Sequence, residues 1–132
     1  MRVLLDTHAL LWWIEGKGHL SGPQARAIGR ADPEHPLLVS DITLWEIAML
    51  QTLGRIALEL PLRDWLERAV APPLVQRQGI SPAIAAEVAS LPESFHHDPA
   101  DRILVATARV LGATLITSDR RILESKLAAT VG

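Results

Sequence analysis

Residues 3–15, VLLDTHALLWWIE, contain the junction that decides the fold. The apolar run Val3-Leu4-Leu5 is typical of a strand that is buried on both faces. Asp6 ends this run, and the residues from Thr7 onward follow at once with the apolar spacing of a helix. A strand that stops at an acid and passes directly into a helix predicts an α/β sheet.

The rest of the chain continues this alternation of strands and helices. Further strands are expected at residues 37–39, 74–78 and 114–117, with an edge strand in the tail after residue 126. Helices are expected at residues 21–31, 42–53, 62–70, 81–90, 100–111 and 120–126, each bounded by a capping residue, glycine or proline. This order predicts a three-layer α/β fold, with a mostly parallel central sheet and helices on both of its faces.

The length and composition set limits on the class of protein. A chain of 132 residues without a linker or repeat is expected to form one domain over residues 1–132. Its longest apolar run, residues 9–14, is too short to cross a bilayer, and no export signal is visible. We therefore expect a cytoplasmic protein with no membrane partner. The absence of cysteine excludes disulfides, thiolate zinc sites and cysteine nucleophiles.

The charge balance bears on nucleic-acid binding. Thirteen basic and fifteen acidic residues give a net charge of −2, which excludes binding through broad positive charge. A nucleic-acid substrate would have to be held by a local site. Eleven of the basic residues are arginine, a side chain suited to phosphate, although genomic base composition explains this preference equally well.

Acidic residues follow the predicted strands. Asp6, Ser40-Asp41 and Ser118-Asp119 each come directly after a strand. Because the carboxyl ends of parallel strands meet at one edge of a sheet, these residues are expected to converge there. Each one alone is also explained as a turn residue or as a helix cap.

Glu46 is an acid in an unusual position. Its predicted helix carries an apolar stripe, and Glu46 falls within it. The stripe is formed by Ile42, Trp45, Met49, Leu50 and Leu53. An ionised carboxylate on a core face costs several kcal/mol unless it is paired. Either Glu46 serves a site, or it lies at the flank of the stripe and reaches water or an arginine.

Asp98 and Asp101 lie on one side of the first turn of their predicted helix. Asp98 precedes a proline and is best explained as the N-cap. Asp101 is one position too deep for capping, so a functional role is more plausible. The alternative for Asp101 is an acid stabilised by the helix dipole or by Arg102.

Taken together, Asp6, Glu46, Asp101 and Asp119 come from four separate elements and are expected to meet at one edge of the sheet. Clustered carboxylates repel one another unless a cation compensates. Oxygen ligands of this kind suit Mg²⁺ or Mn²⁺, which bind substrate phosphates. The pattern therefore indicates metal-assisted phosphoester hydrolysis.

The histidines, tryptophans and arginines give weaker indications. A place on the helix surface is favoured for His8, and His97 is the member of the His96-His97 pair expected beside the acids. A zinc site built from these histidines is disfavoured. Trp12, Trp13, Trp45 and Trp65 are expected in the core or at an interface. Arg102, Arg109, Arg120 and Arg121 form either a solvated face or a set of phosphate contacts.

Three segments resemble a PIN domain, and more narrowly the VapC-type toxins of bacterial type II toxin–antitoxin pairs. They are LLDTHALLWWIEG, VSDITLWEIAMLQTLGRI and FHHDPADRILVATARVLGATLITSDRRI, and they cover nearly the whole chain in the family order. The resemblance implies a ribonuclease dependent on Mg²⁺ or Mn²⁺. Asp6, Glu46, Asp101 and Asp119 match its acidic quartet, with Asp6 and Asp101 as the firmest metal ligands. Thr7 and Thr117 match hydroxyl positions that orient the first and last acids, and Asp98 is a secondary candidate.

The resemblance also implies partners. These are an RNA substrate, a cognate antitoxin whose C-terminal segment occupies the acidic groove, and a second copy of the chain in a homodimer. The tryptophan-rich first and third helices are candidate docking surfaces. The chain departs from the family at Leu50, where lysine is frequent, and at Ala100, where a larger residue is common. The loss of lysine puts one RNA or partner contact in doubt.

Other families fit less well. A phosphatase of the haloacid-dehalogenase type needs a second aspartate two positions after the first, where this chain has His8. Receiver domains need a lysine late in the sheet, and the two lysines here are Lys17 and Lys126. A PIN-like module that binds RNA or protein without cutting is the remaining alternative. Such modules usually lack a core acid, and all four are present, so catalysis is favoured.

Overall fold

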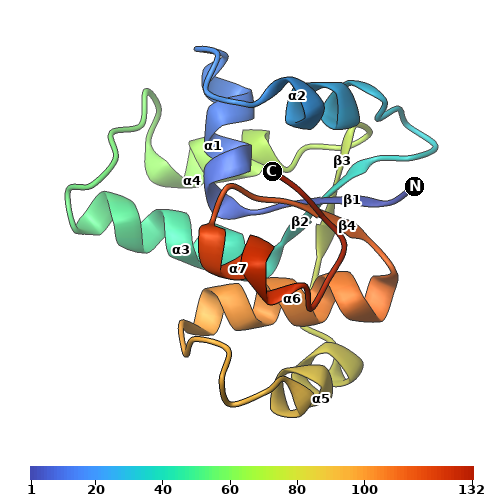
Figure 1. Ribbon diagram of the computed structural model, residues 1–132. Coiled ribbons are helices and arrows are strands. Elements are labelled where there is room, and N and C mark those ends of the chain that lie inside the picture. The colour runs from blue at the N-terminus through green and yellow to red at the C-terminus, as the bar shows by residue number, and fades with distance from the viewer.

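The computed structural model describes all 132 residues and contains one five-stranded sheet (Figure 1). The strands are β1 (Val3–Leu5), β2 (Leu37–Ser40), β3 (Val75–Gln78), β4 (Thr114–Ile116) and β5 (Thr130–Val131). Their order across the sheet is β3-β2-β1-β4-β5, and every neighbouring pair is parallel. The predicted sheet is confirmed, including the edge strand in the C-terminal tail.

Seven helices connect and follow the strands. They are α1 (Thr7–Glu15), α2 (Gly22–Gly29), α3 (Asp41–Thr52), α4 (Leu62–Ala69), α5 (Pro82–Ser90), α6 (Pro99–Leu111) and α7 (Arg120–Ser125). Ser21 and Gln24 form a capping box at α2. Gly16 and Gly112 end α1 and α6 in the left-handed conformation, which glycine adopts without a steric penalty. None of the helices combines the length and apolar character needed to cross a membrane.

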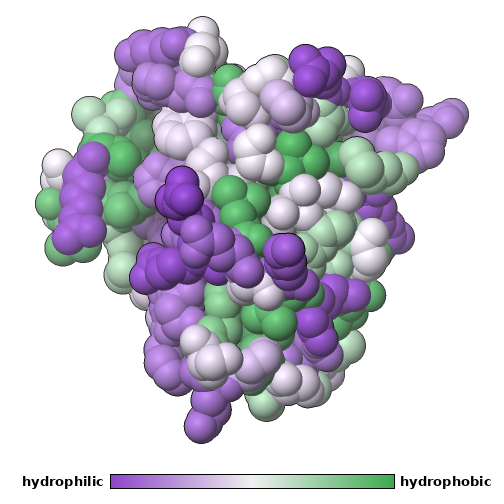
Figure 2. Space-filling model, in the orientation of Figure 1, coloured by the Kyte–Doolittle hydropathy of each residue, from purple (hydrophilic) through white to green (hydrophobic).

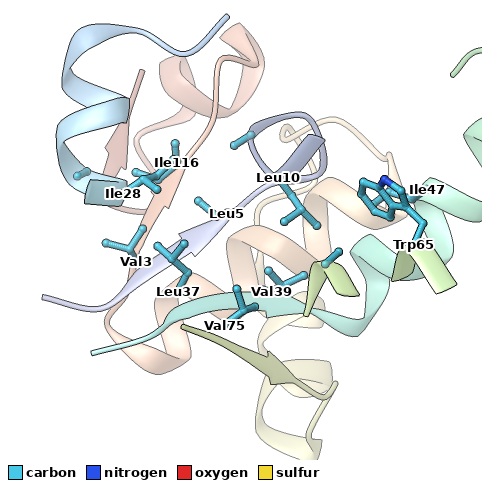
Figure 3. Packing of buried hydrophobic residues seen from close by; sticks show 13 residues of the cluster. Val3, Leu5, Leu10, Ile28, Leu37, Val39, Ile47, Trp65, Val75 and Ile116 are labelled. Atoms are coloured by element: carbon cyan, nitrogen blue, oxygen red, sulfur yellow. The ribbon is translucent and has the colours of Figure 1, made fainter. Parts of the chain in front are cut away.

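Two hydrophobic clusters lie on opposite faces of the sheet, because successive side chains of a strand point to opposite sides. Val3, Leu5 and their neighbours face α1, α2 and α4 (Figure 3), whereas Leu4 faces α6 and α7. Each such buried leucine or valine contributes about 1.5–3 kcal/mol relative to exposure. Helix α5 packs on α6 and forms an outer part of that face (Figure 1). The predicted three-layer arrangement is confirmed.

The topology places β1 at the centre of the sheet. The chain runs outward through β2 and β3 on one side, and then returns to add β4 on the other side of β1. Ligands in open α/β sheets bind outside the carboxyl ends of the strands at such a reversal. Asp6 follows β1, and Asp119 follows β4 after two further residues, so both acids lie at this reversal.

Helix α3 corrects one expectation. The apolar stripe predicted for its core face is largely exposed: Trp45 is 51% exposed, Met49 40% and Leu53 61%. The buried positions of α3 are Thr43 and Ile47, on the side where the helix contacts α1 and α6. The expected core-facing stripe is wrong because helical spacing identifies an apolar face without showing what covers it.

Candidate active site

Asp6 is a buried carboxyl at the end of the central strand. It is the N-cap of α1, and its Oδ1 accepts a hydrogen bond of 2.8 Å from the backbone N–H of Ala9. Burial raises the pKa of the Asp6 carboxyl, and hydrogen bonds from the Thr117 side chain and the Ala9 backbone oppose this only in part. The N-cap bond uses Oδ1, and the Thr117 hydroxyl is the second hydrogen-bond donor to this carboxyl.

Thr117 links the ends of β1 and β4. It is fully buried, and its Oγ1 accepts a 3.1 Å hydrogen bond from the backbone N–H of Asp119. Asp119 caps α7 through Oδ1, which accepts from the N–H groups of Arg121 and Ile122 at 2.9 and 3.3 Å. The negative charge of Asp119 also raises the pKa of Asp6. The two carboxylates therefore share one electrostatic environment, with the Thr117 hydroxyl beside both residues.

Glu46 points from the middle of α3 toward the same edge. The Thr7 hydroxyl donates a hydrogen bond to Glu46 Oε1 and lies 3.4 Å from the Thr43 hydroxyl. Burial raises the pKa of Glu46, and the charges of Asp98 and Asp6 raise it further. Thr7 was expected to orient Asp6, whereas its hydrogen-bond partner is Glu46. Its position in the first turn of α1 directs its side chain toward α3.

Asp101 lies in the first turn of α6. Its pKa is raised to about 7, first by burial and then by the charges of Asp98, Asp119 and Glu46. Asp98 is exposed and is the N-cap of α6, as predicted, with Oδ1 accepting a 3.0 Å hydrogen bond from the Asp101 N–H. Arg102 does not pair with Asp101. The charge that lowers the Asp101 pKa comes from Arg121.

His96 is the site residue that the sequence reasoning missed. Its Nε2 lies 3.2 Å from Asp101 Oδ2, and His96, Asp101 and Asp119 can bring one ligand atom each within 4.8 Å of one another. Burial lowers the pKa of the His96 imidazole, and the positive charge of Arg121 lowers it further, which favours the neutral ring. His97, the histidine expected there, is exposed. Two adjacent residues in an irregular loop carry no periodicity that could tell them apart.

The arginines divide into two groups. Arg102 donates hydrogen bonds to three backbone carbonyls, and Arg109 binds Glu87 Oε2 at 2.6 Å and the Leu127 carbonyl at 2.8 Å. Both guanidinium groups therefore stabilise the fold through hydrogen bonds to other residues of the chain. Arg120 pairs with Glu124, and Arg121 Nη2 lies 3.5 Å from Asp119 Oδ2. Arg121 is the arginine of this set placed at the acidic edge.

Asp41 and His8, two other residues considered for the site, form no hydrogen bond with the four acids. The Asp41 carboxylate binds Arg77 at 2.9 and 3.2 Å, while Ser40 provides the α3 cap. His8 is exposed on α1, where its ring packs 5.9 Å from that of Trp12. This agrees with its expected place on the helix surface.

The cluster as a whole is an electrostatically strained set of acids. Charge coupling joins Asp6 to Asp119 and Glu46, and joins Asp101 to Glu46 and Asp119. Burial and mutual repulsion raise the pKa of Asp6, Glu46 and Asp101, which is the condition that a bound cation relieves. The donor set consists of carboxylate oxygens and one buried imidazole nitrogen that has no hydrogen-bond partner. This chemistry fits a divalent cation.

Comparison with known proteins identifies the family to which this fold belongs. Residues 3–126 match the family model of the PIN domain. The chain belongs to the PIN-domain family. Over 120 residues it is 41% identical to a Mycobacterium tuberculosis protein named ribonuclease VapC22, covering 91% of this chain and 88% of that protein. The resemblance drawn from the sequence motifs is confirmed at the level of the family.

Solved structures share this PIN fold at low identity. VapBC2 of Rickettsia felis, bound to a DNA fragment from its promoter, matches with a TM-score of 0.72 and 12% identity, over 99% of this chain and 98% of that chain. VapBC-1 of nontypeable Haemophilus influenzae matches with a TM-score of 0.69 and 16% identity, over 99% and 97% of the two chains. These similarities show the same PIN fold along nearly the full chain.

Proposed function

We propose that this PIN domain is a divalent-metal-dependent endoribonuclease and the toxin of a type II toxin–antitoxin pair. The observation that carries the proposal is the coupling of four acids from separate elements, Asp6, Glu46, Asp101 and Asp119, at the carboxyl edge of the sheet. The identity to a protein named as a ribonuclease supports RNA as the substrate class. RNA as the substrate also favours the cytoplasm as the location of the protein.

The four acids would hold Mg²⁺ or Mn²⁺, directly or through water. Asp6 and Asp101 are the leading ligands, and Glu46 and Asp119 complete the set. When bound, the cation polarises the phosphodiester, activates water and stabilises the leaving oxygen. Asp98 is a secondary candidate, since it caps α6 while its charge acts on both Glu46 and Asp101.

Two threonines keep the carboxylates in position. The Thr7 hydroxyl holds Glu46 at the acidic edge, and Thr117 lies between Asp6 and the backbone of Asp119. Both threonines are buried, so their rotamers are restricted by packing. Such support matters because removing the groups that orient metal ligands typically lowers metal affinity or enzyme activity about 10–100-fold.

Two apolar surfaces suit the protein partners. A groove of about 760 Å³ lies beside α1 and α4 and includes Trp12, Trp13 and the 55–60 segment. Hydrophobic side chains also gather over the end of α3 and the loop after it, at the left of the view in Figure 2. His8 lines this groove and also acts on the charge of Asp6, so the groove adjoins the acidic edge. We therefore assign the groove to the antitoxin. We assign the exposed face of α3 to a second copy of the chain.

The proposal is tested by incubating the purified protein, free of antitoxin, with total bacterial RNA and Mn²⁺ or Mg²⁺. The expected result is discrete cleavage products that disappear with EDTA and with Asp6→Asn. A protein that binds RNA but leaves it intact, in the presence of bound metal, would favour the alternative of a binding module. Cleavage that persists in Asp6→Asn would remove this residue from the ligand set.

A further inference from the structure

The segment before α6 holds His96 in a fixed position. Phe95 is buried, and its ring packs edge-on against the His96 ring at a centroid distance of 4.6 Å. Arg102 binds the carbonyls of Pro92, Phe95 and His96 at 3.0, 2.6 and 2.9 Å, and its guanidinium lies 5.7 Å from the centre of the Phe95 ring. These contacts determine the backbone path that carries the His96 imidazole to the acidic edge.

The inward nitrogen of this ring has no hydrogen-bond partner. His96 Nε2 is buried, and although it lies 3.2 Å from Asp101 Oδ2, the two atoms are not aligned for a hydrogen bond. Buried polar atoms in folded proteins are nearly always paired, so an orphaned one calls for a ligand or another function. The neighbouring carboxylates, Asp101 and Asp119, supply the other ligand atoms of a compact group of three.

We propose that His96 Nε2 is a direct ligand of the divalent cation, beside the carboxylates of Asp101 and Asp119, and that it makes the centre prefer Mn²⁺ to Mg²⁺. The proposal rests on the metal site of the proposed function and names a nitrogen ligand outside the acidic quartet. Mg²⁺ takes oxygen ligands almost exclusively, whereas imidazole nitrogen suits transition metals. A nitrogen ligand therefore adds more to the affinity for Mn²⁺ than for Mg²⁺.

The direct test is spectroscopic and uses Mn²⁺ alone as the probe. Pulsed electron paramagnetic resonance of the Mn²⁺-loaded protein is expected to show coupling to the ¹⁴N nucleus of an imidazole. The coupling is expected to persist in His97→Leu, the matched change at the exposed neighbour. It is expected to vanish in His96→Leu. Because His8 lies near Asp6 and Glu46, His8→Leu is the second control and is expected to keep the coupling.

Metal affinity gives an independent readout. Calorimetric titration is expected to show that His96→Leu weakens Mn²⁺ binding at least about 10-fold and changes Mg²⁺ binding by less than about threefold. His97→Leu is expected to leave both affinities unchanged. If circular dichroism shows that His96→Leu is misfolded, the test uses His96→Gln together with the electron paramagnetic resonance spectrum of the Mn²⁺-loaded wild-type protein.

The outcomes separate this proposal from the proposed function. Saturable Mn²⁺ binding without ¹⁴N coupling in the wild-type protein would overturn the His96 assignment and leave the metal-dependent nuclease standing. Coupling that survives in His96→Leu would likewise assign the nitrogen to another residue. A wild-type protein that binds neither Mn²⁺ nor Mg²⁺ would contradict the metal centre itself.

Discussion

The hydroxyl group of Thr7 donates a hydrogen bond to the carboxylate of Glu46, a residue 39 positions further along the chain. Thr7 lies directly after Asp6 at the start of α1, and Glu46 lies in the middle of α3. This hydrogen bond therefore joins two helices at the carboxyl edge of the sheet. It directs a half-buried carboxylate toward Asp6 and Asp101, whose electrostatic environment it shares.

Removal of this hydroxyl is expected to impair catalysis more than folding. In Thr7→Val the Glu46 carboxylate loses its donor, and we expect kcat for RNA cleavage to fall roughly 10–100-fold, as for other groups that orient metal ligands. Thr7→Ser keeps the hydroxyl and is expected to retain most of the activity. Single-turnover kinetics measures both variants, and equal rates for Thr7→Val and the wild-type protein would show that Glu46 needs no such support.

Asp101 makes the stability of the metal-free protein depend on pH. Its pKa is about 7 in the folded state against an ordinary value of 3.8, so between these values the folded protein keeps a proton that the unfolded chain has lost. The free energy of unfolding is therefore expected to fall as the pH rises through this interval. The raised pKa values of Asp6 and Glu46 act in the same direction.

The substitution Asp101→Asn removes this ionisation. In EDTA at pH 8 we expect the variant to melt roughly 3–6 °C higher than the wild-type protein, and the difference to shrink toward pH 4. Asp64→Asn, at an exposed position of α4, is the control and is expected to leave the pH profile unchanged. A lower melting temperature for Asp101→Asn at pH 8 would contradict the repulsion among the acids.

Arg102 is expected to matter for stability through its contacts with backbone carbonyls. Arg102→Ala leaves the carbonyls of Pro92, Phe95 and His96 without their donor, at a cost of about 1–3 kcal/mol. Arg120→Ala is the control, because Arg120 makes only an exposed pair with Glu124 and is expected to change stability by less than about 0.5 kcal/mol. Urea denaturation compares the two variants. Similar midpoints of unfolding would show that water replaces Arg102 as the hydrogen-bond donor to these carbonyls.

The exposed face of α3 is expected to mediate self-association. Trp45, with 51% of its surface exposed, lies on the same face as Met49. Trp45→Glu places a charge within this apolar surface. We therefore expect the dissociation constant of the dimer to rise at least about 100-fold while the monomer keeps its fold. Analytical ultracentrifugation with circular dichroism checks both expectations. Unchanged association in Trp45→Glu would place the dimer contact elsewhere.

The elements and the gathering of the acids could be predicted because both follow from local rules. Apolar runs such as residues 3–5 and caps such as Ser21 or Gly112 mark the ends of elements without knowledge of the packing. Parallel strands then bring Asp6 and Asp119 to the same edge.

The remaining features depend on tertiary contacts that have no local pattern. The outward direction of Trp45 depends on how α3 lies against α1 and α6. The partners of Arg102 are backbone carbonyls, which look alike in every sequence. The place of His96 inside the cluster, and of His97 outside it, follows from the path of an irregular loop. Such features appear only once the chain is folded.

Acids from separate elements form a single cation-binding centre in this proposal, and calorimetric titration with Mn²⁺ at pH 7 measures that centre without depending on RNA cleavage. We expect saturable binding by the wild-type protein and by the surface control Asp64→Asn. Asp6→Asn and Asp119→Asn, which alter the ends of two different strands, are both expected to weaken binding at least about 10-fold. Mn²⁺ affinities equal to that of the wild-type protein in these two variants would contradict a cation-binding centre shared by Asp6 and Asp119.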